Sequence, residues 1–294
     1  MAEALCGLGR MHAIRVERDP AKPLIDEALA IFVELGDRRG MAQCHEALGV
    51  ALRGTPDDIE HYEMAVGLYR EIAAEHELTS ALFSMAYRAL IPTGRFIEAR
   101  AALNESHELC FRHGFRHGAL HAATGLGQLA RLEGDLESAR RILCDTLDGV
   151  RDLGDRRCTV RMLTGLARVT LVEKDLTKTF ELLEEAGGTL SQLDRGLSSD
   201  AHELVDALAL VTLETGDLES AARMFGASEA IRNRQGLLRA PPDQAVVSDA
   251  VQALRADLGG AHFRALVYEG SQMTLEDLVS SASSLGTTET VGPV

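Results

Sequence analysis

The sequence predicts an all-α fold, a right-handed α-solenoid of about six helical hairpins closed by a C-terminal helical cap. A turn recurs about every forty residues: Gly54, Gly94, Gly134 and Lys174 are spaced by 40, and Gly216 follows after 42. Between the turns, apolar residues recur at i, i+3, i+4 and i+7, as in amphipathic helices. Repeats of this length are stacked units, each too small to bury its own apolar face.

The amino-acid sequence of the turns also repeats, and it indicates two turns in each unit. Glu133–Ala139 and Thr215–Ala221 share the sequence Gly-Asp-Leu-Glu-Ser-Ala, and Leu35–Arg39 recurs as Leu153–Arg157. Two alternating turns divide each unit into two helices, so we interpret each unit as a helical hairpin.

The helices follow in order from this pattern. We expect the first helices of the hairpins at about 2–14, 39–53, 79–92, 117–133, 157–173 and 199–215. We expect the second helices at about 21–35, 57–75, 95–113, 135–153, 175–193 and 217–235. Asp135, Asp175 and Asp217 are placed to cap the later second helices, because a carboxylate at this position accepts from free N–H groups of the first turn.

The pattern changes after Gly236, where Pro241-Pro242-Asp243 ends the array and begins a new helix. We expect helices at about 243–257, 260–269 and 274–283, the last opened by Thr274 with Asp277 three residues later. A solenoid needs a polar-backed terminal unit, which this segment can supply. The predicted domains are a repeat array over 1–237, capping helices over 238–285 and a disordered tail over 286–294.

Composition restricts the classes of function. The net charge of −15 argues against direct binding of nucleic acid, since duplex DNA would be repelled. The sequence has no leader peptide and no long apolar run, so we expect a cytoplasmic protein without a membrane partner. Five widely spread cysteines form no C-x-x-C pair and predict neither a disulfide framework nor a zinc site. We expect no cofactor.

Small residues at equivalent positions of the first helices carry a family resemblance. They are Gly9, Gly49, Gly127, Ala167 and Ala209, with Tyr87 as the exception. Bulky residues recur on the second helices at Tyr62, Leu103, Leu143, Leu183 and Phe225. This interlock resembles the tetratricopeptide (TPR) pattern, lengthened to about 40 residues.

The C-terminal stretch indicates a narrower family than the general TPR pattern does. Its segments are Gly216–Arg232, Pro241-Pro242, Leu254–Gly259, Tyr268–Gly270 and Met273–Leu278. Their order resembles the end of the MalT-like TPR sensor region in bacterial LuxR-type and STAND-class signalling ATPase regulators. The resemblance implies a regulatory arm whose partner is an ATPase or output domain and which acts in signal transduction and transcription regulation. The sequence itself has no phosphate-binding loop, G-x-x-x-x-G-K-[S/T], and no helix-turn-helix with a basic face.

Two other classes of function are compatible with a helical repeat, an adaptor and an enzyme. A free-standing TPR adaptor that binds an acidic peptide or protein partner is the alternative. An enzyme is not expected, because the sequence shows neither a nucleophile elbow nor an acid–base pair at a recognisable spacing.

The first helices of a TPR-like array line its concave groove, and that row is rich in arginine and threonine in an otherwise acidic chain. The predicted binding residues for a partner or an anionic small ligand are Arg53, Arg88, Thr124, Gln128, Arg131, Thr164 and Arg168. Arginine holds carboxylate or phosphate groups through paired donors. The alternative is a solvated helix face with ordinary ion pairs.

A weak metal candidate lies at one turn between helices. His117 and His121 are spaced i, i+4, which can place two imidazoles on one metal ion. No carboxylate completes a recognisable set nearby in the sequence. We therefore prefer a duplicated Phe-Arg-His-Gly turn with exposed histidines and predict no metal.

Overall fold

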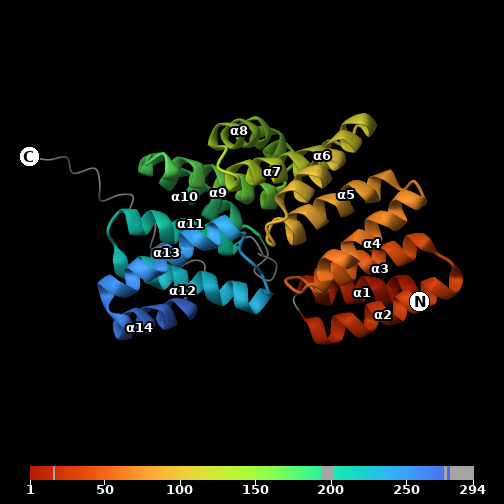
Figure 1. Ribbon diagram of the computed structural model, residues 1–294, viewed down its shortest axis with the longest axis horizontal. Coiled ribbons are helices and arrows are strands. Elements are labelled where there is room, and N and C mark those ends of the chain that lie inside the picture. The colour runs from red at the N-terminus through yellow and green to blue at the C-terminus, as the bar shows by residue number, and fades with distance from the viewer. Residues whose placement is uncertain (16, 194–200, 275–276, 279–294) are drawn as a thin grey trace, which may run out of the picture. The chain divides into compact units, whose positions relative to one another are not determined.

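The computed structural model describes residues 1–15, 17–193, 201–274 and 277–278, and every regular element in these ranges is helical, with no strand (Figure 1). The hairpin pairs are α1 (Ala2–Ile14) and α2 (Arg18–Leu35), α3 (Arg38–Ala51) and α4 (Asp57–Glu71), and α5 (Glu75–Met85), η1 (Ala86–Leu90) and α6 (Phe96–His113). They continue with α7 (Arg116–Leu132) and α8 (Leu136–Asp152), α9 (Arg156–Val172) and α10 (Leu176–Ser191), and α11 (Ala201–Glu214) and α12 (Leu218–Gln235). Two more helices follow, α13 (Pro241–Leu258) and α14 (Gly260–Ser271).

The all-α prediction is confirmed, and each of these helices was expected within a few residues of its place. The helix predicted at 274–283 and the tail at 286–294 lie mostly or wholly outside the described residues. The start of that last helix is described: the backbone N–H of Asp277 donates to Oγ1 of Thr274 at 3.2 Å, and the Asp277 carboxylate accepts from Thr274 in return.

The turn recurring every forty residues is a left-handed backbone position. Gly54, Gly94, Gly134 and Gly216 have φ angles of 76°, 78°, 83° and 86°, and Lys174 has 62°. Glycine carries no Cβ penalty there and ends a helix with a compact reversal. Lys174 takes the same left-handed conformation although its Cβ makes that conformation unfavourable.

Aspartates begin the helices that follow the turns. Asp135, Asp175 and Asp217 accept hydrogen bonds from the backbone N–H three residues later, at 3.0, 2.9 and 3.0 Å. Their predicted capping role is confirmed. Asp37 and Asp155 cap first helices in the same way, a role that was not predicted. In the Leu-Gly-Asp-Arg-Arg motif, therefore, the glycine takes the left-handed conformation and the aspartate caps the next helix.

Small residues let successive helices approach closely. A Cβ added at Gly49 would lie 2.8 Å from the Tyr62 ring, and one added at Gly125 would lie 2.6 Å from Leu103. The bulky partners are buried, so each glycine accommodates a large side chain of a neighbouring helix.

One repeat departs from the pattern. It carries Tyr87 at the position where other first helices have glycine or alanine, and its helix continues as a π-helix over Ala86–Leu90. The Tyr87 ring stacks on Phe83, with ring centroids 5.5 Å apart. π-helical segments occur frequently at functional sites, and this one carries Arg88.

The chain forms two compact units. The first contains Met1–Leu129 with Gly236–Ala240, and the second contains Ala130–Gln235 with Pro241–Val294. The division falls within α7, inside the array predicted over 1–237, and no feature of the sequence indicates it. The predicted domain boundaries stay predictions.

In the second unit, α14 packs lengthwise against α12 (Figure 1). A Cβ added at Gly226 would overlap the backbone of Val267, and one added at Gly270 would overlap the carbonyl of Arg223. These glycines allow near backbone contact between the two helices. Phe263 and Leu266 of α14 are buried, as are Met224 and Phe225 of α12.

Candidate anion-binding site

Two of the predicted arginines lie together in the second unit. Arg131 is in the last turn of α7, and Arg168 is in the second half of α9. Both lie on first helices, of successive hairpins, as the register of the repeat predicted. The third participant is Asp243, in the first turn of α13, which Pro241 and Pro242 begin because proline suits the first helical position.

Asp243 holds both guanidinium groups. Nη1 of Arg131 donates to Oδ1 of Asp243 and Nη2 donates to Oδ2, both at 2.9 Å. Nη2 of Arg168 lies 2.9 Å from Oδ1 of the same carboxylate. Paired donors on one carboxylate are the strong, directional form of this interaction.

Burial distinguishes this cluster from the ion pair of Arg140 and Glu173, which joins one hairpin to the next. The side chains of Arg131, Arg168 and Asp243 are 10%, 9% and 15% exposed. The side chains of Arg140 and Glu173 are 43% and 40% exposed. Exposed pairs contribute about 0–1 kcal/mol, whereas a buried charge without a partner is costly.

Burial and the neighbouring charges act on Arg168 in opposite directions. Burial lowers the pKa of Arg168, Asp243 opposes this, and the neighbouring positive charge of Arg131 lowers it again. Asp206 and Glu203 on α11 raise the same pKa by smaller amounts. The guanidinium groups of Arg131 and Arg168 thus both bind the carboxylate of Asp243.

The surroundings of Arg168 also include neutral polar groups. Thr164 lies one turn before it on α9 and is 2% exposed, and its Oγ1 has no hydrogen-bond partner among the described residues. Asp206 accepts a 2.6 Å hydrogen bond from Oγ of Ser228, which is buried in α12. A buried hydroxyl without a partner carries a desolvation cost that a bound ligand could relieve.

The other predicted binding residues belong to the first unit. Arg53 is buried and donates from Nη2 to the carbonyl of Ala13 and from Nε to the carbonyl of Val50, both at 3.2 Å, so it ties the end of α3 to the end of α1. Thr124 donates to the carbonyl of Leu120 at 2.8 Å. Gln128 is buried one turn after it in α7.

Arg88 lies near a half-buried carboxylate in the first unit. Burial raises the pKa of Glu46, and Arg10, a hydrogen bond from Tyr69 and Arg88 each lower it. The Tyr69 hydroxyl donates to Oε2 of Glu46 at 3.4 Å. The structure thus brings together Arg131 and Arg168 on one carboxylate and places Arg88 in a different polar cluster.

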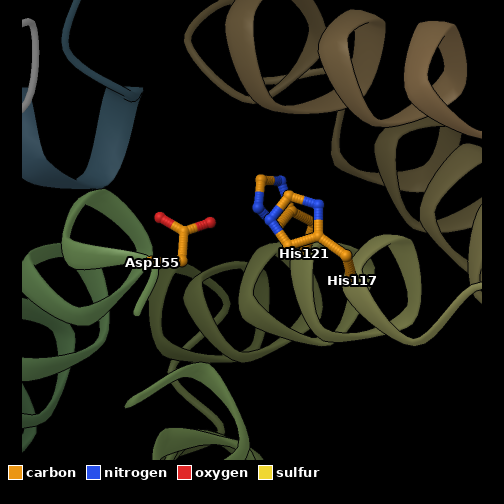
Figure 2. Close-up of side chains that lie close together, drawn as sticks. All are labelled: His117, His121 and Asp155. Carbon is orange, nitrogen blue, oxygen red and sulfur yellow. The ribbon is translucent and has the colours of Figure 1, made fainter. Parts of the chain in front are cut away.

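The two histidines of the metal hypothesis are neighbours in the first unit. Figure 2 shows the two imidazole rings beside each other, and their ring centroids are 4.3 Å apart. The His121 ring also meets the Phe83 ring edge-on. Figure 2 also labels Asp155, a residue of the second unit that caps α9. A second histidine pair, which the sequence did not indicate, is His45 and His61: their Nδ1 atoms are 3.1 Å apart and their ring centroids 5.3 Å apart.

Asp243 is the site residue that sequence reasoning missed. It was noted only as the start of a helix after two prolines. The available signal was the pair of arginines at adjacent repeat positions in an acidic chain, since such charges require a counter-ion when they are buried. Nothing in the sequence indicates which carboxylate, 112 residues from Arg131, supplies it.

The chain matches no protein-family model and no curated protein. Among solved structures it is similar to BtubC (BKLC) from P. vanneervenii, with 15% identity over 79% of this chain and 91% of that chain and a TM-score of 0.40. A likeness this distant carries no argument about function, so we infer function from the chain's own residues. Within the described part of the chain, none of the helices combines the length and apolarity that a bilayer crossing requires.

Proposed function

We propose that this protein is a non-enzymatic binding scaffold that holds an acidic segment of a protein partner against the first-helix surface of its second unit. In this proposal the helices form a right-handed TPR-like solenoid in the cytoplasm, with α13 and α14 as its C-terminal cap. Arg131 and Arg168 anchor a carboxylate of the partner, and Thr164 supplies a neutral hydrogen bond beside them.

One observation supports this proposal above the others. Two buried arginines from successive repeats converge on a single carboxylate, with Arg131 in bidentate geometry. Ion pairs that only solubilise a helix face are exposed, as Arg140 and Glu173 are. A buried arginine pair is the arrangement that recognises a planar anion.

The proposed context is the sensor arm of a bacterial STAND- and LuxR-type regulator, with an ATPase or output domain as partner. The resemblance of the C-terminal sequence segments supports this context. A free-standing adaptor would use the same binding surface. An ATPase reading frame directly upstream and in phase would favour the regulator, and an unrelated upstream gene would favour the adaptor.

The binding test uses a fluorescein-labelled hexaglutamate peptide in an anisotropy titration at low salt. Arg168→Gln should weaken binding about tenfold or more, because a charge-assisted hydrogen bond contributes about 1.5–3 kcal/mol. Arg141→Gln is the matched control, since Arg141 is exposed on α8. Equal loss in both variants, or no loss in either, would contradict the proposed site.

A further inference from the structure

The site on α7 and α9 is already filled by the chain's own carboxylate. We propose that α13 is an intramolecular competitor: Asp243 occupies the position that a carboxylate of the partner takes, and the partner binds by displacing the start of α13. This inference rests on the proposed function and adds the regulation of the same site. It also restricts the ligand, because the resident group is a carboxylate.

The attachment of α13 is suited to release. Its buried residues are Val247, Ala250 and Leu254, and Asp243 lies on the same stripe at i, i+4, i+7 and i+11. Most of its other side chains are exposed, including Val246. Helix α14, in contrast, is held against α12 by near backbone contact at Gly226 and Gly270. The two helices after the array are therefore anchored very differently.

Competition has a quantitative consequence. When a binding-competent state is populated only in part, the apparent dissociation constant is the intrinsic one divided by that fraction. As long as Asp243 holds both arginines, an acidic peptide meets an occupied site. Removing the competing carboxylate should therefore raise affinity for the peptide, although it removes a stabilising ion pair from the free protein.

The test compares three variants with the same labelled hexaglutamate peptide. Asp243→Asn should bind the peptide at least about tenfold more tightly than the unmodified protein. Asp249→Asn makes the same charge change at an exposed position of α13 and should leave affinity unchanged within about twofold. Adding Arg168→Gln to Asp243→Asn should abolish the gain.

A second route to the same result leaves every charge in place. Leu254 is fully buried, so Leu254→Ala weakens the docking of α13 without touching the arginine pair. It should also tighten binding of the peptide, and it keeps the proposal testable if Asp243→Asn does not fold.

The outcomes separate the two proposals. If neither Asp243→Asn nor Leu254→Ala gains affinity while Arg168→Gln still weakens binding, competition by α13 is wrong and the binding site stands. If no form of the protein binds hexaglutamate, both proposals are wrong. A gain that persists without Arg168, or that inorganic phosphate reverses as effectively as glutamate peptide does, would overturn carboxylate recognition at this site.

Discussion

Arg131 and Asp243 lie 112 residues apart and form two parallel hydrogen bonds of 2.9 Å, Nη1 to Oδ1 and Nη2 to Oδ2. Arg168 shares the same carboxylate from the next repeat. The pair connects the end of α7 to the start of α13, so the stability of the second unit and the occupancy of its candidate site depend on one side chain.

Removing that carboxylate should destabilise the free protein. Asp243→Asn removes a carboxylate that two largely buried guanidinium groups bind, and breaking a buried pair costs about 3–5 kcal/mol. Because the cluster keeps some solvent contact, we expect the lower end of this range for the second unit. Urea denaturation followed by circular dichroism measures it, and Asp249→Asn should change stability by less than about 0.5 kcal/mol.

The crossing of α12 and α14 depends on glycine. Gly270→Ala places a methyl group on the carbonyl of Arg223 and should cost about 1–3 kcal/mol through overpacking, with increased binding of a hydrophobic dye as Phe225 becomes exposed. Gly260→Ala on the same helix is the control, because a Cβ there would meet nothing closer than 3.6 Å. Equal melting temperatures for the two variants would mean that the helices do not need close contact.

Replacing glycine by alanine should destabilise the protein at a left-handed turn and stabilise it inside a helix. Gly134→Ala forces a Cβ into a backbone with φ of 83° and should destabilise by about 1–2 kcal/mol. Gly188→Ala lies inside α10, where a Cβ meets nothing within 4 Å, and should stabilise by about 0.5–1 kcal/mol. Thermal unfolding of both variants tests this. A stabilising effect at Gly134 would contradict the role assigned to the recurring turn.

Acid should weaken the first unit through its histidine pair. Burial lowers the pKa of His45 and of His61 below 6.5. The charge of His61 lowers the pKa of His45 further, and Glu60 opposes this. The facing charged groups are Glu60, Asp57 and Asp26, which favour protonation of His61, and Lys22, which opposes it.

The sign of the effect follows from proton binding. The unfolded chain binds more protons than the folded one once the pH falls below about 6.5, so these histidines contribute stability above that pH that is lost on acidification. The melting temperature should fall between about pH 7.5 and 5.5, and His45→Gln with His61→Gln should flatten that fall. An identical pH dependence in the double variant would exclude the pair as its source.

Local features of the fold could be predicted from the sequence because they depend on neighbouring residues. A left-handed residue followed by an aspartate cap needs only a few positions, which is why Gly134 and Asp135 mark the start of α8 correctly. The π-helical segment Ala86–Leu90 could not be predicted, because no turn or capping residue marks it in the sequence.

The candidate site could be predicted only in part. The repeat register placed Arg131 and Arg168 on equivalent helices, and the structure brings both to one carboxylate. Their partner Asp243 comes from outside the repeats, so no periodicity indicates it. Arg53 occupies an equivalent register position but donates to the carbonyl of Ala13, a contact that the register does not indicate.

Hydrogen exchange of the unmodified protein, with and without saturating hexaglutamate peptide, tests the central claim most directly. If the peptide takes the place of Asp243 at Arg131 and Arg168, amides of α13 over 241–258 should exchange faster in the complex, while α8 and α10 keep their protection. Unchanged or increased protection of α13 in a protein with bound peptide would contradict the account.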